Sequence, residues 1–192
     1  GGMRQRAVIA MGLMVTPSLL IADEPTTALD VTVQADVVRL ITEINRAEGT
    51  AVIFVSHNIA LVSEVCHRVV VMYAGRIVEE LPADELASAR HPYTQALIAS
   101  VPTLATDRSA PLVSIGGQPP DPSALPPGCA FADRCPLVED QCRTAVPELL
   151  GDRGHRAACF VAQIASEAGR SAPQSGSRVG GSRVGGSREV LP

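Results

Sequence analysis

Two adjacent carboxylates, Asp23 and Glu24, follow directly on a short apolar run at residues 19–22. Four apolar residues in a row are typical of a strand that is buried on both faces, as in a parallel sheet. Ligands bind at the carboxyl edge of such sheets. An aspartate there can hold Mg²⁺, and a neighbouring glutamate can orient or deprotonate a water for attack on a phosphate. Taken alone, however, the two acids fit a solvated acidic turn better.

His57 stands at a second junction of the same kind. Residues 51–55 predict another buried strand, and Ser56-His57-Asn58 follow it before a short helix. Because the carboxyl ends of parallel strands meet at one edge, we expect His57 to lie near Asp23 and Glu24. An isolated histidine would more often cap a helix or pack against neighbours, but a position beside two acids favours a functional role.

Gly1 and Gly2 open a predicted helix, which should end before Thr16. Glycines at a helix start leave backbone N–H groups bare at the positive end of the helix dipole, and this geometry suits an anion. For the two glycines alone, a loop without function is the simpler interpretation.

The other predicted elements place these residues in an α/β fold. Asp30 is expected to cap a helix that ends at Gly49, because apolar residues recur between them at helical spacing. Residues 68–73 and 76–79, on either side of Ala74-Gly75, predict a hairpin.

Composition restricts the possible functions. The net charge is -4 and no basic stripe is visible, which argues against nucleic-acid binding. No apolar run reaches the roughly 18 residues of a membrane span, and no signal peptide is recognisable, so we expect a cytosolic protein. All 16 basic residues are arginine, so no G-x-x-x-x-G-K-[ST] loop is present. Since the sequence starts in a helical pattern without methionine, we expect a fragment or the product of a broken gene.

Four of the five cysteines gather in the second half of the chain. They are spaced C-x5-C-x6-C-x16-C, at Cys129, Cys135, Cys142 and Cys159. Four thiolates can hold zinc or a [4Fe–4S] cluster, although the C-x2-C spacing of most zinc sites is absent. Disulfides are disfavoured in the cytosol, and four free structural thiols are the remaining alternative. His155 is a possible substitute ligand but more simply a surface residue, and Cys66 is most simply a buried apolar residue.

Four short motifs together resemble those of ABC-transporter ATPases. They are Gly1-Gly2-Met3-Arg4-Gln5-Arg6, Leu19 to Glu24, Thr27-Ala28-Leu29-Asp30 and Ser56-His57. In this order they look like the signature motif, Walker B with its catalytic glutamate, the D-loop and the H-loop. The resemblance implies a partial P-loop NTPase core in residues 1–81.

The resemblance also implies a role for each residue of the sheet edge. Asp23 would hold Mg²⁺ through water. Glu24 would be the general base or the group that positions water. His57 would contact the γ-phosphate of ATP and help to couple the two halves of an ATPase dimer.

A second set of implied roles concerns that dimer. Gly1 and Gly2, with Gln5 nearby, would contact ATP held by the opposite subunit, and Asp30 would help to link the two sites. The serine that precedes Gly-Gly in the family is missing here.

The second half of the chain carries its own resemblance. The string HPYTQAL at residues 91–97 and the segment 128–136 are similar to the C-terminal extension of oligopeptide/dipeptide importer ATPases. In that family such cysteines can ligate a [4Fe–4S] cluster, which implies a cluster at Cys129, Cys135, Cys142 and Cys159. We therefore expect an extension at residues 82–165, including a Pro/Gly-rich connector at 103–128, and a disordered low-complexity tail at 166–192.

The family resemblance implies an ATPase that drives di- or oligopeptide import from the cytoplasmic face of the cell membrane. Its partners would be a second ATPase subunit, identical or different, two membrane permease subunits and an extracytoplasmic peptide-binding protein. One alternative is an inactive remnant or docking protein. Another is a DNA-repair or chromosome-organising ATPase, against which the HPYTQAL string and the acidic balance argue.

We expect the 192-residue chain by itself to lack useful affinity for ATP. The Walker A loop, the adenine-stacking aromatic and the Gln-bearing loop of the family are not found in this sequence. Walker A supplies most contacts to the phosphates. A calorimetric ATP titration should therefore show no binding in the micromolar range, and a micromolar Kd would contradict the expectation.

Overall fold

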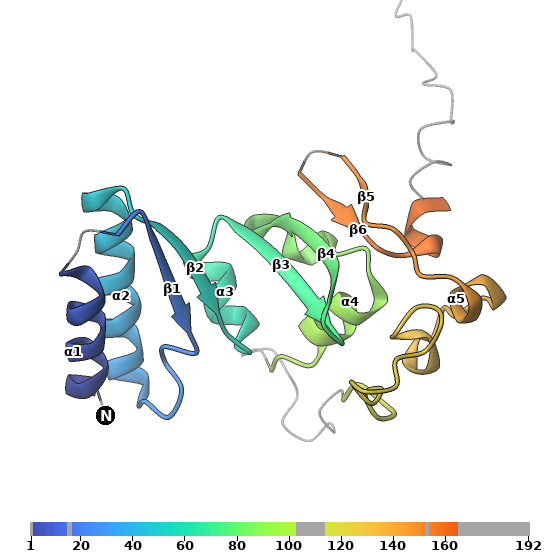
Figure 1. Ribbon diagram of the computed structural model, residues 1–192, viewed down its shortest axis with the longest axis horizontal. Coiled ribbons are helices and arrows are strands. Elements are labelled where there is room, and N and C mark those ends of the chain that lie inside the picture. The colour runs from blue at the N-terminus through green and yellow to red at the C-terminus, as the bar shows by residue number, and fades with distance from the viewer. Residues whose placement is uncertain (1, 15–16, 103–113, 153, 165–192) are drawn as a thin grey trace, which may run out of the picture.

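The computed structural model describes residues 2–14, 17–102, 114–152 and 154–164. Gly1, residues 103–113 of the predicted connector and the predicted tail at 166–192 lie outside this range. Helices and strands alternate through the first part of the chain, and small strands and short helices follow (Figure 1). The mixed helix and strand content agrees with the predicted α/β class.

The first part is a parallel two-stranded sheet with two helices beside it (Figure 1). Strand β1 (Leu19–Asp23) pairs with β2 (Ala51–Val55) in register from Leu19 opposite Ala51 to Asp23 opposite Val55. Helices α1 (Gly2–Leu13) and α2 (Val31–Glu48) pack against each other on one side of this sheet. The register brings the carboxyl ends of both strands to one edge.

Helix α2 begins and ends where the sequence predicts. The carboxylate of Asp30 accepts a hydrogen bond from the Val33 N–H at 3.0 Å, which satisfies a free donor of the first turn. Gly49 closes the helix with a φ of 66°, a left-handed conformation that glycine adopts without a steric cost.

Strands β1 and β2 are not buried on both faces, and that prediction is wrong. Ala22 is buried against α2, whereas Ile21 is 63% exposed and Ile53 is 48% exposed. Side chains alternate between the faces of a strand, and the two helices lie against only one face of the sheet in the described part of the chain. The continuous apolar runs therefore suggest strands buried on both faces, although only every second side chain is covered by the helices.

The second part is an antiparallel sheet in the order β3-β4-β6-β5. Its strands are β3 (Arg68–Tyr73), β4 (Arg76–Pro82), β5 (Leu150–Gly151) and β6 (Arg156–Ala157). The predicted hairpin is β3–β4, and Ala74 and Gly75 turn it with φ values of 48° and 76°. Because β4 pairs with β6, this sheet joins residues from both sides of the expected boundary at residue 82.

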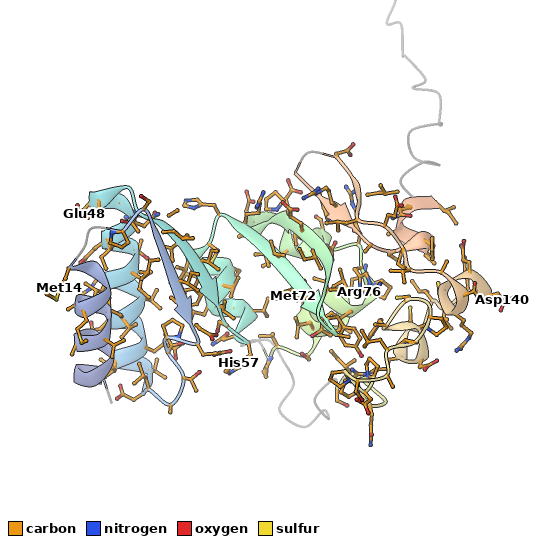
Figure 2. All side chains as sticks on the ribbon, viewed as in Figure 1. Met14, Glu48, His57, Met72, Arg76 and Asp140 are labelled. Carbon is orange, nitrogen blue, oxygen red and sulfur yellow. The ribbon has the colours of Figure 1, made fainter. Side chains whose placement is uncertain are left out.

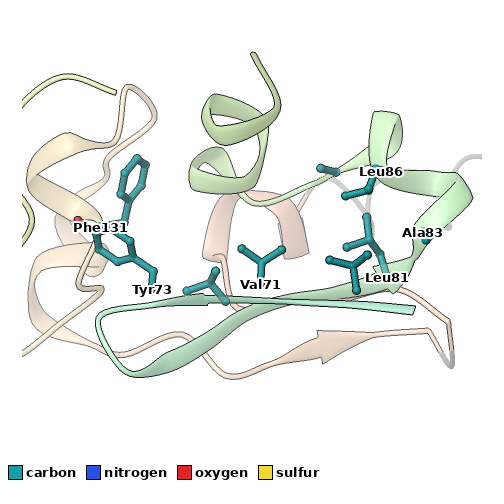
Figure 3. Packing of buried hydrophobic residues seen from close by; sticks show 9 residues of the cluster. Val71, Tyr73, Leu81, Ala83, Leu86 and Phe131 are labelled. Atoms are coloured by element: carbon teal, nitrogen blue, oxygen red, sulfur yellow. The ribbon is translucent and has the colours of Figure 1, made fainter. Parts of the chain in front are cut away.

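A hydrophobic core covers the inner face of the β3–β4 hairpin. Figure 3 shows Val71, Tyr73 and Leu81 on the same side as Leu86 and Phe131. The rings of Tyr73 and Phe131 meet edge to face with centroids 5.3 Å apart. The short helices of this part are α3 (Ile59–Val65), η1 (Ala83–Ser88), α4 (Pro92–Ala99), η2 (Ala132–Arg134) and α5 (Asp140–Thr144).

Helix α4 contains most of the HPYTQAL string and starts as predicted. Pro92 occupies its first turn, where a missing N–H costs nothing. His91 is the N-cap, and its Nδ1 accepts a hydrogen bond from the Tyr93 N–H at 3.0 Å. The histidine and proline of this string therefore define the start of the helix.

Candidate functional site

Glu24 lies directly beyond the end of β1, at the edge that the sequence singles out. Its backbone N–H donates to the Val55 carbonyl at 2.9 Å, which extends the parallel pairing by one bond. Its φ of 45° is unusual for a residue with a side chain. The chain thus turns sharply at Glu24 and leaves its carboxylate beside the end of β2.

The carboxylate of Glu24 meets His57, as the shared sheet edge predicts. His57 Nδ1 lies 2.8 Å from Glu24 Oε1, and the His57 backbone N–H donates to the same oxygen at 3.0 Å. An ionised carboxylate only accepts hydrogen bonds, so Nδ1 carries the proton and Nε2 faces away. The His57 side chain is 78% exposed at the end of β2 (Figure 2). Glu24 and His57 thus form one solvent-accessible unit.

Thr27 holds the second oxygen of Glu24. Its hydroxyl donates to Oε2 at 2.8 Å, and its N–H donates to the Glu24 carbonyl at 3.2 Å. Ala28 follows with a φ of 60°, so the turn is tight and partly left-handed. The Thr27 hydroxyl was not among the predicted site residues, although its place three residues after Glu24 in a turn is a recognisable signal.

The hydrogen bonds of Glu24 should affect the pKa of its carboxyl group. The hydrogen bond from His57, and then that from Thr27, lowers the pKa of Glu24 below its ordinary value of 4.5. The pairing of Glu24 with His57 therefore stabilises the fold at pH values above 4.5. This contribution to stability is lost as the pH falls through the lowered pKa of Glu24. His57→Ala should move the Glu24 titration midpoint, followed by NMR of its carboxyl carbon, back up. An unchanged midpoint would contradict the contact.

The other predicted site residues are spread around this edge. Asp23 is the exposed last residue of β1, next to Glu24. Asp30 uses its carboxylate to cap α2. Gly2 and Gln5 lie in α1, which is a separate element, and Gly1 lies outside the described residues. The structure therefore brings Asp23, Glu24 and His57 together at the carboxyl edge of β1 and β2.

The four clustered cysteines line one apolar pocket in the second part of the chain. It is walled by Cys129, Cys135, Cys142 and Cys159, with His91 and Phe131 among the other lining residues. The Cys129 N–H donates to the Cys142 carbonyl at 2.8 Å. All of these cysteines are free thiols. The four cysteines that the sequence groups together thus line one pocket, which His91 also lines.

Burial affects the acidity of three of the pocket thiols. Burial raises the pKa of the Cys129, Cys135 and Cys159 thiols, and charge on a neighbouring thiol raises it further. These groups are therefore neutral at pH 7, and a metal would have to displace protons to bind them.

Comparison with known proteins agrees with both parts of the structure. Residues 78–142 match the family model for the C-terminal region of oligopeptide/dipeptide transporters. A probable peptide ABC transporter ATP-binding protein of Sinorhizobium fredii is 51% identical over 162 residues, which is 83% of this chain and 48% of that protein. A putative peptide import ATP-binding protein of Brucella ovis is 50% identical over 161 residues, 81% of this chain and 48% of the relative. Over more than four fifths of its length, the chain resembles the ATP-binding proteins of peptide ABC transporters.

A third relative of this peptide-transporter family is longer. The oligopeptide transport ATP-binding protein OppD of Mycobacterium tuberculosis is 48% identical over 174 residues, which is 90% of this chain and 28% of OppD. The chain thus spans about half the length of the Sinorhizobium and Brucella relatives. None of the helices in the described part of the chain combines the length and the apolar character needed to cross a membrane.

The possible metal ligands were compared by their positions in the described part of the chain. Within residues 2–14, 17–102, 114–152 and 154–164, no three histidine, cysteine or acidic side chains are arranged around a point that could hold one metal ion. A four-iron cluster takes one thiolate on each iron and so spreads its ligands around a larger body.

The expectation that His155 lies at the surface is wrong. Its side chain is 5% exposed, and Nε2 lies 2.7 Å from Oε1 of the fully buried Glu79. Seventy-six positions separate the two residues along the chain. Sequence spacing gives no signal for this contact, because it depends on the pairing of β4 with β6.

Proposed function

We propose that this chain supplies the water-activating edge of an ATPase subunit that drives the import of di- or oligopeptides. The observation that carries the proposal is the hydrogen-bonded pair of Glu24 and His57 at the carboxyl edge of β1 and β2. The relatives support the class of cargo, since both are described as peptide transport proteins, and the Brucella ovis relative, described as a peptide import protein, supports the direction.

The hydrogen bonds of Glu24 indicate where the attacking water would bind. A carboxylate offers about four lone-pair positions, two on each oxygen. Oε1 already accepts two donors from His57, whereas Oε2 accepts the Thr27 hydroxyl. The open position on Oε2 would accept a proton of the attacking water and orient its oxygen toward the γ-phosphate. The lowered pKa of Glu24 keeps the carboxylate ionised for this role.

His57 and Asp23 would meet the phosphates. With Nδ1 on Glu24, His57 turns its exposed Nε2 outward, where it would contact the γ-phosphate. Asp23 ends β1 with an exposed carboxylate, and carboxylate oxygens suit Mg²⁺. A bound Mg²⁺ would neutralise charge on the phosphates. Gly1, Gly2, Gln5 and Asp30 are proposed to contact the opposite subunit and its ATP.

The proposed setting is a peripheral complex on the cytoplasmic face of the cell membrane. A second ATPase subunit, two permease subunits and an extracytoplasmic peptide-binding protein would complete it. The four thiols are proposed to hold a [4Fe–4S] cluster that staples a segment with little core of its own. Anaerobically isolated protein should then contain about four iron and four sulfide per chain.

Peptide uptake by cells tests the proposed function. The native gene would be replaced by a copy that encodes Glu24→Gln, and uptake of a labelled tripeptide would be measured beside uptake of a free amino acid. Tripeptide uptake should be lost while amino-acid uptake persists. Unchanged tripeptide uptake, with the variant protein present at normal abundance, would contradict the proposal and favour an inactive remnant.

A further inference from the structure

Glu79 is a carboxylate with no exposed surface in the middle of β4. Oε1 accepts the Arg90 N–H at 2.6 Å and lies 2.7 Å from His155 Nε2. Oε2 accepts the His91 N–H at 3.2 Å. One buried side chain therefore joins three segments: β4, the start of α4 and the segment before β6.

Two of these segments continue into the wall of the thiol pocket. His91 lines the pocket, and Cys159 lines it four residues after His155. The intervening chain is fixed by strand pairing, since Ala157 lies opposite Glu79 and the Ala158 N–H donates to the Val78 carbonyl at 2.8 Å. This pairing ties the segment between His155 and Cys159 to β4, the strand that carries Glu79.

Burial of a carboxylate here is not explained by stability alone. Burying charge or polar groups is costly, and well-packed apolar residues often stabilise a core as well or better. A carboxylate can in addition fix the positions of several donor groups, because it accepts hydrogen bonds on both oxygens. A glutamine of the same shape would place an amide NH₂ opposite a backbone N–H of either Arg90 or His91, so it cannot satisfy all three neighbours.

We propose that Glu79 and His155 are positioning residues for the thiol pocket: together they hold the segment that presents Cys159 and the histidine that caps α4. The functional meaning of this positioning rests on the proposed metal-binding role of the pocket. The geometric claim, that the pair fixes Cys159, applies to the metal-free chain as well.

Thiol alkylation of the metal-free 192-residue chain tests this directly. Iodoacetamide labelling of Cys159 would be followed by mass spectrometry, with Cys66, the C-cap residue of α3, as the internal reference. Glu79→Gln should speed labelling of Cys159 about 10-fold, because loss of a buried hydrogen bond favours local opening. Labelling of Cys66 should not change. Labelling of Cys159 at the wild-type rate would overturn the proposal.

Glu80→Gln is the matched control. Glu80 is the next residue of β4 and also contacts β6, but its partners Arg68 and Arg156 are substantially exposed. Removing its charge should change Cys159 labelling less than about 2-fold, because the glutamine oxygen can still accept a hydrogen bond from Arg156 and both arginines keep access to water. An equal acceleration in both variants would show that any weakening of β6 has the same effect, and it would overturn the specific role of Glu79.

A second pair of variants covers the case in which Glu79→Gln loosens the whole chain and labels Cys66 faster as well. His155→Gln keeps an amide nitrogen near the position of Nε2, whereas His155→Leu does not. Wild-type labelling of Cys159 in His155→Gln and acceleration in His155→Leu would support the proposal. Wild-type rates in both would overturn it. Iron and sulfide analysis of the wild type tests the proposed cluster separately, since either labelling outcome stands without it.

Discussion

Glu24→Gln should lower the rate of ATP hydrolysis between about 100-fold and 10,000-fold in the native polypeptide that carries this sequence, because the variant loses its general base. The amide preserves the shape of the side chain, so ATP binding should persist. Phosphate release under single-turnover conditions measures the chemical step without product release. The predicted loss is therefore in the rate of hydrolysis and not in the affinity for ATP.

Glu43→Gln provides the matched control for this change. Glu43 lies on the exposed face of α2, and its Oε1 lies 3.9 Å from Nε of Arg39. The substitution removes the same charge from the same part of the molecule, and hydrolysis should stay within about 2-fold of wild type, as expected for an exposed ion pair. A hydrolysis rate in Glu24→Gln equal to that of Glu43→Gln would show that Glu24 does not activate water.

Gly128→Ala should collapse the thiol pocket and destabilise the chain by roughly 3 kcal/mol or more, since overpacking against backbone cannot relax. A Cβ at this position would lie 2.3 Å from the Cys142 carbonyl oxygen and 2.6 Å from the Arg143 carbonyl carbon. The hydrogen bond from the Cys129 N–H to the Cys142 carbonyl would be pushed apart. Urea unfolding of the 192-residue chain measures the change in free energy.

Gly116→Ala is the control for the glycine substitution. A Cβ at Gly116 meets no atom within 4 Å, although the residue lies near Arg134 in the same part of the fold. The free energy of unfolding should therefore change by less than about 0.5 kcal/mol. Equal stability of the two variants would mean that Gly128 does not make the close backbone approach described here.

The sequence is informative about the first site because that site follows from local rules. An apolar run that ends in acids and a second run that ends in His57 place both groups at the carboxyl edge of a parallel pair. The structure brings Glu24 and His57 to 2.8 Å at that edge. Caps are equally local, and Asp30 and Gly49 bound α2 as predicted.

The buried network and the exposed strand faces could not be predicted in the same way. Glu79 and His155 meet only because β4 pairs with β6 across 76 positions. Neither residue type is usually buried, so each reads as a surface residue by itself. The exposure of Ile21 likewise depends on which face of β1 is covered, and an apolar run does not encode this.

The central claim is that Glu24 and His57 act as one unit in hydrolysis, and a double-mutant cycle tests it most directly. Single-turnover hydrolysis would be measured for Glu24→Gln, His57→Ala and the double variant of the native polypeptide. Residues that act as a unit give strongly non-additive losses. The double variant should therefore hydrolyse ATP no more slowly than Glu24→Gln alone. A double variant whose loss equals the product of the two single losses would contradict the account.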